Sequence, residues 1–335
     1  MKYFNNLKIY LLCFVFVPLL VITTACGSDA DTSSEKETIR LTHVVAEDHP
    51  YHQAAEEFKE EVEEESDGKL EVEIYPDGQL YESEREAIEA IQLGDVEMSR
   101  VATPALSSFI SEFSVLNLPF LFEDTKEAHA ALDGELGDKL TELLSEEGLV
   151  AFGYGENGFR HFLTDKPIES PDDFSGMSIR VIENKMYEDL FNSLGANASP
   201  LGFGETYTAL QQGVYDGMDS EIASASTGSF YEVLDYLTLS NHAYTATVNI
   251  IDEDFYDSLS EDLQGVLEDA TYTLNERHRE LNMEHEEEGL EELKENMEVN
   301  ELTQEQTDKF KEELQPIFEK YEEEIGEDIV KLANQ

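Results

Sequence analysis

The segment from Asp257 to about Glu298 carries a long helical pattern, and it constrains the fold more than any other feature of this chain. The segment contains no proline, and only Gly265 and Gly289 interrupt its helix-forming residues. About 40 residues of α-helix would span roughly 60 Å, which exceeds the width of one small domain. We therefore expect this helix to brace two domains, for which a chain of 335 residues is long enough.

Strand and helix patterns alternate along the rest of the chain, which is typical of an α/β fold. Residues 70–75 alternate apolar and acidic side chains, as a half-buried strand does, and residues 53–65 place their apolar side chains on one helical face. Pro316 should start or kink the last helix. The expected strands are 39–45, 70–75, 96–102, 149–154, 177–181 and segments within 237–251. The other expected helices are 53–65, 84–93, 125–146, 185–194 and 205–212.

The N-terminal segment has the pattern of a secretory signal. Two lysines precede an apolar run from Ile9 to Ile22, which is too short to cross a membrane comfortably as a helix. The run ends at Thr23-Thr24-Ala25-Cys26, which resembles a bacterial lipobox except for Thr23. We predict a lipoprotein signal peptide at 1–25, then lipidated Cys26 and a flexible tether over 26–38; an ordinary signal peptide that contains a cysteine is the alternative.

The acidic composition excludes one class of partner. The chain has 76 Asp and Glu against 21 Lys and Arg, a formal net charge of −55. This field repels phosphate backbones, so we expect no nucleic-acid partner. An acidic surface is also typical of proteins that work in high salt or outside an alkaliphilic cell, and composition favours neither setting.

Enzyme and metal motifs are absent from the sequence. It contains no G-x-S-x-G, H-E-x-x-H, P-loop or G-x-G-x-x-G pattern, so we expect neither an enzyme nor a cofactor. His43, His49 and His52 lie close together at an expected strand-to-helix turn, where loop or capping roles are favoured over a metal site. Residues 216–221 lack calcium-loop spacing, and we interpret them as a ligand-facing loop.

The arginines are the most informative polar residues. Arg85, Arg277 and Arg279 lie among acidic residues in helical segments, where surface ion pairs are expected. Arg100, Arg160 and Arg180 instead have apolar neighbours. A guanidinium group in such a context needs a partner, and its planar fork matches a carboxylate. That partner is either an internal acid or the carboxylate of a ligand, which so acidic a chain captures only with local positive charge.

Four sequence runs resemble one family. Leu118–Phe122, 171–181, 194–200 and 205–217 (ETYTALQQGVYDG) are similar to segments of the solute-binding subunits of TRAP (tripartite ATP-independent periplasmic) transporters, the DctP-like family. The resemblance covers 41–122 and 155–251 in the family's order. It implies two α/β domains around a cleft, a periplasmic-binding-protein-like (Venus-flytrap) fold with crossing strands and a long bracing helix. Domain I is expected over 39–157 plus about 245–285, and domain II over 158–244 plus about 286–335.

The same resemblance implies the site. Arg180 corresponds to the arginine that pairs bidentately with the substrate carboxylate, and Arg160 to a second site arginine. Phe203 matches an apolar wall, and Ser220 stands where many members carry asparagine. Asp219 belongs to the same run. Arg100 is expected to hold a second carboxylate or a hydroxyl-rich tail.

The expected function is capture of a small organic acid, a C4-dicarboxylate or a sugar acid, for TRAP membrane permease subunits. The protein is expected to be a monomer, anchored by lipid to the outer face of the cell membrane. A ligand sensor for a receptor kinase would share the same pocket. A secreted enzyme acting on organic acids would need a base and nucleophile in contact, and the sequence offers no such pair.

Overall fold

The computed structural model describes residues 36–333. The predicted signal peptide, Cys26 and most of the predicted tether lie outside the described residues. The strands are β1 (Glu37–Thr42), β2 (Leu70–Tyr75), β3 (Met98–Ala102), β4 (Leu149–Val150), β5 (Gly155–Thr164), β6 (Ser178–Val181), β7 (Asn197–Pro200), β8 (Gly217–Ser220), β9 (Tyr236–Asp252) and β10 (Glu298–Glu301).

Helices alternate with these strands, as expected for an α/β fold. They are α1 (Pro50–Glu65), α2 (Glu84–Gln92), α3 (Thr103–Leu106), α4 (Thr125–Leu132), α5 (Glu135–Glu146), α6 (Lys185–Ser193), α7 (Phe203–Gln211), α8 (Ile222–Thr227), α9 (Glu253–Ser258), α10 (Glu261–Asn296), α11 (Gln304–Ile325) and α12 (Glu327–Leu332). Short 3₁₀ helices span Ser111–Asn117, Pro171–Phe174 and Phe230–Glu232.

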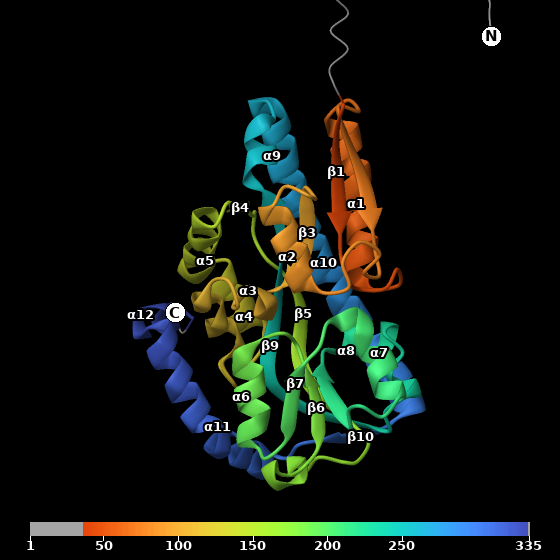
Figure 1. The fold of residues 1–335 in the computed structure, drawn as a ribbon, viewed down its shortest axis with the longest axis vertical. Coiled ribbons are helices and arrows are strands. Elements are labelled where there is room, and N and C mark those ends of the chain that lie inside the picture. The colour runs from red at the N-terminus through yellow and green to blue at the C-terminus, as the bar shows by residue number, and fades with distance from the viewer. Residues whose placement is uncertain (1–35, 334–335) are drawn as a thin grey trace, which may run out of the picture. The chain divides into compact units, whose positions relative to one another are not determined.

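The strands described by the structure join in one ten-stranded sheet, in the order β2-β1-β3-β9-β5-β8-β6-β7, with β4 and β10 also pairing with β9 (Figure 1). The first three strands are parallel to one another, and so are β8, β6 and β7. Between these two groups, β9 runs antiparallel to both β3 and β5. The α/β class expected from the alternating patterns is therefore confirmed.

The long strand β9 connects the two groups of parallel strands. Its residues 247–251 pair with β3, and its residues 236–247 pair with β5. The β5–β9 ladder shifts register twice, between Glu156 and Gly158 and between Arg160 and Phe162. Such bulges re-aim side chains, and these two lie on either side of Arg160.

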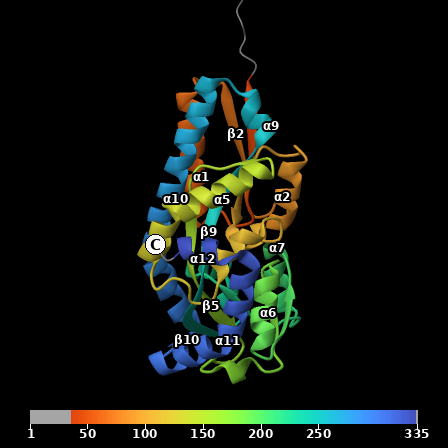
Figure 2. The same ribbon diagram turned by 90° about the vertical axis from the view of Figure 1, so that its left-hand side faces the viewer.

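The predicted long helix is confirmed as α10, which has 36 residues and spans roughly 54 Å. Ser260 caps its start and separates it from the short helix α9. Leu274 packs in a hydrophobic cluster with Phe58 and Val62 of α1, and α1 runs beside α10 in Figure 2. Further along, Leu293 joins a second cluster with Met218 of β8 and residues of α8. One helix thus packs against elements from both groups of strands.

Several sequence-based boundaries were wrong. The expected helix 125–146 is divided into α4 and α5, because Gly134 ends the first and caps the second. The expected strand 149–154 ends at Val150, because Gly153 has a positive φ of 75°. Residues 217–220 form the buried strand β8 rather than a loop, and β5 was not predicted.

Pro316 does not start a helix, which was one of the two expected roles; it lies inside α11. Because proline has no backbone N–H, the carbonyl of Glu312 lacks its usual helical donor at position 316. Both Pro316 and Glu312 are exposed. Water can therefore bind that carbonyl, which lowers the cost of an internal proline.

No helix among residues 36–333 combines the length and the apolar character that crossing a lipid bilayer requires. The domain boundaries expected from the sequence stay a prediction.

Leu274 gives a test of the α1–α10 packing. The Leu274→Ala variant removes a side chain that is 1% exposed, and we expect unfolding to become easier by about 2–5 kcal/mol. Met283→Ala is the matched control on the same helix, since Met283 is 57% exposed, and should change stability by less than about 0.5 kcal/mol. Urea unfolding followed by circular dichroism measures both, and equal losses in the two variants would contradict the packing.

Candidate binding site

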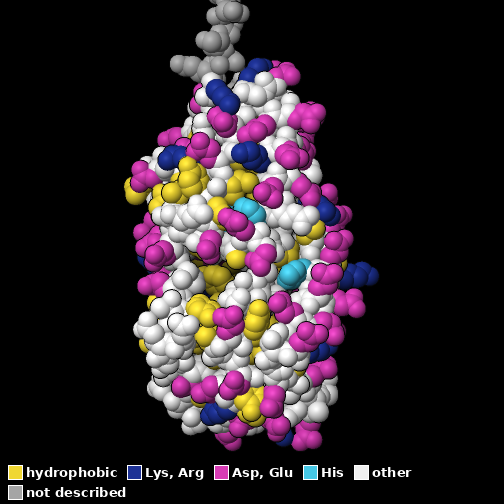
Figure 3. Space-filling model, turned by 90° about the vertical axis from the view of Figure 1, so that its right-hand side faces the viewer, with side chains coloured by type: hydrophobic (Ala, Val, Ile, Leu, Met, Phe, Trp, Pro, Cys, Tyr) yellow, Lys and Arg dark blue, Asp and Glu magenta, His cyan; other side chains and the backbone are white. Residues whose placement is uncertain are grey.

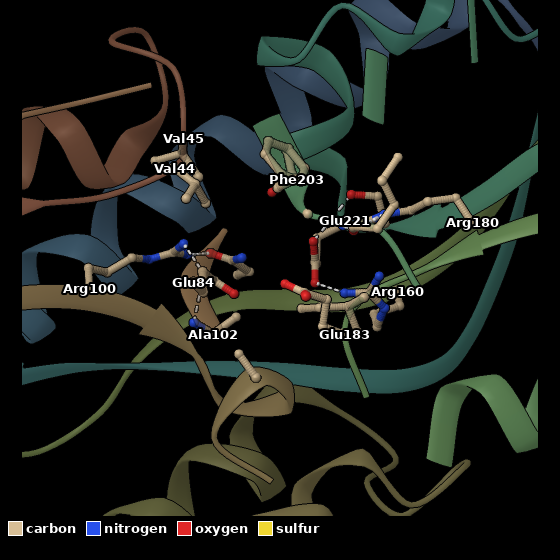
Figure 4. Close-up of a pocket in the computed structure, with 17 residues that line it drawn as sticks. Val44, Val45, Glu84, Arg100, Ala102, Arg160, Arg180, Glu183, Phe203 and Glu221 are labelled. Atoms are coloured by element: carbon tan, nitrogen blue, oxygen red, sulfur yellow. Dashed lines mark hydrogen bonds and ion pairs between the residues drawn. The ribbon is translucent and has the colours of Figure 1, made fainter. Parts of the chain in front are cut away.

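A cavity lies among the ends of β3, β5, β6 and β8, the loop after β1 and the start of α7. The space between its walls, including the part open to solvent, is about 520 Å³. Figure 4 shows Arg100 and Glu84 on one side, and Arg160, Arg180 and Glu221 on the other. The other lining residues are Val44, Val45, Ala102, Ala105, Asn157, Ile182, Glu183, Leu201, Gly202, Phe203, Ser220 and Ser224.

Arg180 is a buried cation without a carboxylate partner. It lies on β6 and is 2% exposed. Its Nε and Nη2 donate to the backbone oxygen of Leu201, at 3.0 and 2.7 Å. Within the described part of the chain it forms no ion pair. Burial and, secondarily, the nearby Arg160 lower the pKa of Arg180 to about 10, so the guanidinium is still charged at neutral pH.

Arg160 lines the same cavity, but internal acids occupy its donors. Its Nε donates to Asp219 Oδ2 and its Nη1 to Glu221 Oε1, both at 2.5 Å. Nη1 also reaches the hydroxyl of Thr245, and Nη2 reaches the Asp219 backbone oxygen. Although burial acts in the other direction, these carboxylates hold the pKa of Arg160 well above its usual value. Arg160 therefore adds little uncompensated positive charge to the cavity.

Asp219 lies behind Arg160 rather than on the cavity wall. It is fully buried on β8, and its carboxylate also contacts His242 Nε2 at 3.3 Å. Burial alone would raise the pKa of Asp219, but the Arg160 guanidinium outweighs it and holds that pKa well below its usual value. Among the predicted site residues, Asp219 is thus placed to orient Arg160 and not to line the space.

Arg100 forms the opposite wall. It extends from β3, is 1% exposed, and its Nη2 donates to Asn157 Oδ1. Its Nη1 donates to Glu84 Oε1 over a longer distance, 3.4 Å, while the ring of Tyr51 lies 5.3 Å from its guanidinium carbon. Its Nε has no partner among the described residues. Arg100 is therefore paired, though less tightly than Arg160.

Phe203 and Ser220, the remaining predicted site residues, also line the cavity. The ring of Phe203, at the start of α7, lies 6.0 Å from the guanidinium carbon of Arg180. Ser220, at the end of β8, donates to Glu221 Oε2 at 3.3 Å. The structure thus brings Arg100, Arg160, Arg180, Phe203 and Ser220 together, and their roles in ligand binding stay a prediction.

Sequence reasoning missed Glu84 and Asn157, and it included Glu221 only as part of the ligand-facing segment 216–221. Glu84 shares a helical face with the buried Ile88 and Ile91, four and seven positions later. An acid on an apolar face is a signal that the sequence itself contains. Burial raises the pKa of Glu84, although Arg100 and the Ala102 amide, which donates to Oε1 at 2.9 Å, favour its charged form.

None of the three clustered histidines lines the cavity, although the charge of Arg100 acts on both His43 and His49. His49 caps α1 by accepting from the Tyr51 amide, so the predicted capping role is confirmed for this residue. His43 Nε2 lies 3.1 Å from His52 Nδ1. Burial, with a smaller contribution from Arg100, lowers the pKa of His43 to about 3, so this ring is neutral at pH 7.

The other arginines form the expected surface pairs. Arg85 contacts Glu89, Arg277 contacts Glu57, and Arg279 contacts Asp133. On the face drawn in Figure 3, acidic side chains are far more frequent than Lys and Arg, as the net charge of −55 leads us to expect.

Comparison with known proteins shows the family to which the chain belongs. Residues 41–324 match the DctP family model, described as bacterial extracellular solute-binding protein, family 7. The C4-dicarboxylate-binding protein DctB of Bacillus subtilis is 32% identical over 306 residues, which are 90% of this chain and 87% of that protein.

Two solved structures share the fold. One is a TRAP periplasmic solute-binding protein of Sulfurospirillum deleyianum with bound succinate, with a TM-score of 0.86, 33% identity, and coverage of 89% of this chain and 98% of that one. The other is the sugar acid binding protein DctPAm of Advenella mimigardefordensis with galactonate, with a TM-score of 0.86, 36% identity, and coverage of 90% and 98%. The chain described here therefore belongs to the DctP family of bacterial extracellular solute-binding proteins, as its sequence runs had indicated.

Proposed function

We propose that this protein is the solute-binding subunit of a TRAP transporter and captures a small organic acid, a C4-dicarboxylate or a sugar acid, in the cavity around Arg180. The observation that carries the proposal is the buried guanidinium of Arg180, which has no carboxylate partner within residues 36–333. A buried charge is costly unless it is paired, and a ligand carboxylate would supply the missing partner. The solved relatives that bind succinate and galactonate both hold carboxylates, which supports this assignment.

The net charge of −55 makes local positive charge necessary for capture. An organic anion that approaches the acidic surface is repelled, and only salt screening and nearby cations reduce that repulsion. Arg180 gives the anion an attractive contact inside a space of low dielectric constant, where the pairing is stronger than in water. The exposed Lys and Arg residues cannot do this, because water and salt screen them.

Closure around the ligand follows from the predicted domain boundaries. Glu84 and Arg100 belong to predicted domain I, whereas Arg180, Phe203 and Glu221 belong to predicted domain II, and the cavity lies between them. A ligand that touches both sides favours the closed arrangement by its differential affinity, as in hinged binding proteins. The closed form would then be presented to the membrane subunits.

We further propose that the protein acts outside the cytoplasm as a monomer, attached through lipidated Cys26 to the outer face of the cell membrane. The family's extracellular role and the sequence pattern before Cys26 support this location. A sensor for a receptor kinase would use the same cavity, but the related proteins of known ligand favour transport. These relatives are solute-binding proteins and not enzymes.

Arg180→Ala should lower affinity for the bound organic acid at least about 100-fold, because the ligand carboxylate would lose a desolvated ionic partner. Isothermal titration of the full-length chain with succinate and with galactonate measures the loss. Arg180→Lys, which keeps the charge but lacks the planar fork, should recover only part of the affinity. Arg85→Ala is the control, since Arg85 forms an exposed pair with Glu89 and should leave affinity unchanged. Affinity of the wild-type strength in Arg180→Ala would refute the site.

Cys26→Ser should release the protein from the membrane, because the hydroxyl of serine does not accept the lipid that the predicted lipobox directs to a cysteine thiol. Fractionation of cells that express each form, followed by immunoblotting, measures the distribution. Ligand affinity should be unchanged in the released protein. If Cys26→Ser is retained on the membrane to the same extent as the wild type, the lipid anchor is wrong.

A further inference from the structure

The charges that line the cavity are balanced. Arg100, Arg160 and Arg180 face the space together with Glu84, Glu183 and Glu221. Asp219, fully buried behind Arg160, adds one more negative charge to the same cluster. Three arginines therefore do not mean three vacant positions for ligand carboxylates, because the protein's own acids neutralise most of the positive charge.

The ion pairs of the three arginines show which guanidinium group has no acidic partner. Asp219 and Glu221 each contact Arg160 at 2.5 Å, so its guanidinium is fully compensated. Arg100 pairs with Glu84 at 3.4 Å and with the side-chain oxygen of Asn157. Among the described residues, Arg180 is the one arginine of the three without an ion pair, and its Nε and Nη2 donate to a neutral backbone oxygen. Arg180 is therefore the arginine left for a ligand, and its guanidinium can pair with one carboxylate.

Two glutamates offer hydrogen-bond acceptors to the cavity, Glu84 on the side opposite Arg180 and Glu221 on the same side as Arg180. Glu84 uses Oε1 for Arg100 and for the Ala102 amide, and no hydrogen bond to its Oε2 is found among the described residues. Glu221 Oε2 receives only the long contact from Ser220, at 3.3 Å. A second ligand carboxylate near these oxygens would be repelled, whereas a hydroxyl group would donate a hydrogen bond to them. Hydrogen bonds to charged acceptors are stronger than neutral ones.

We infer that the cavity selects a polyhydroxylated monocarboxylate, such as an aldonate, over a dicarboxylate, and that Glu84 and Glu221 are the residues that determine this choice. The ligand's single carboxylate pairs with Arg180, and its hydroxyl groups donate to Glu84 on the opposite side of the cavity and to Glu221 on the side of Arg180. This inference rests on the proposed function, since it requires that Arg180 hold a carboxylate. It narrows the substrate class that family membership leaves open, because relatives bind both succinate and galactonate.

The first test compares two groups of probes on the full-length wild-type chain by isothermal titration in one buffer. One group contains galactonate and gulonate, and the other contains succinate and malate. The best polyhydroxylated monocarboxylate should bind at least about tenfold more tightly than the best dicarboxylate. A tenfold ratio is what one charge-assisted hydrogen bond typically provides.

The second test removes the charge of each glutamate while keeping the shape of its side chain. Glu84→Gln should weaken galactonate and strengthen succinate, because a neutral amide accepts less strongly from a hydroxyl and also donates to a carboxylate. We expect the ratio of the two affinities to fall at least about tenfold. Glu221→Gln should act in the same direction and serves as the second variant if Glu84→Gln melts at a lower temperature. Glu86→Gln is the matched control, since this exposed residue shares the first turn of α2 and the same helix dipole.

The outcomes separate this inference from the proposed function. If succinate or malate binds as tightly as the aldonates and Arg180→Ala abolishes that binding, the proposed function stands and the selectivity is refuted. A ratio that Glu84→Gln and Glu221→Gln leave unchanged refutes the role of these two residues. If neither group of probes binds, the proposed function fails and the inference fails with it.

Discussion

The burial of three guanidinium groups around one cavity is the constraint on which the rest of the site depends. Arg100, Arg160 and Arg180 are 1%, 3% and 2% exposed, so each has lost nearly all of its hydration. Removing a charge from water costs several kcal/mol unless fixed partners replace the water. The fold supplies different partners to each: an acid and an amide to Arg100, two acids to Arg160, and a backbone carbonyl to Arg180. Chemically identical side chains thus acquire different capacities for an anion.

The sheet makes this arrangement possible because it brings distant segments to one place. Arg100 extends from β3 and Arg160 from β5, and both strands pair with the single long strand β9. The two bulges beside Arg160 change the alternation of side chains locally, so its position does not follow from simple strand periodicity. Behind the sheet, α10 packs against α1 and also against α8. Strand pairing and helix packing together hold the arginines at the cavity.

Charged side chains have different effects at the surface of this molecule and inside its cavity. At the surface, the excess of acids is screened by salt and contributes little to any single contact. Inside the cavity, Arg180 is buried and has no ion pair among the described residues, so its charge acts at short range on an anion that enters. We infer that Arg180, together with the carboxylates of Glu84 and Glu221, sets a preference among organic acids that total charge does not explain.

The fold class, the long helix and the buried arginines could be predicted from the sequence alone. The alternating patterns predicted an α/β fold, the uninterrupted pattern after Asp257 predicted α10, and apolar neighbours distinguished Arg100, Arg160 and Arg180 from the surface arginines. These features are local, so they can be read from residue periodicity and immediate context. Glu84 could also have been predicted as a site residue from the sequence, because its acidic side chain interrupts the apolar face of α2.

The partners of each arginine were decided only by tertiary structure. Glu84 meets Arg100 across 16 residues, and Asp219 and Glu221 meet Arg160 across 59 and 61. No spacing rule connects such positions, because the contact depends on strand order and register. Strand β8 was mistaken for a loop because it is short and contains Asp219, whose charge is compensated by Arg160 only in the folded protein. The sequence therefore identified the arginines that are buried, whereas the fold determined which of them has charge left for a ligand, since pairing requires residues that only folding brings together.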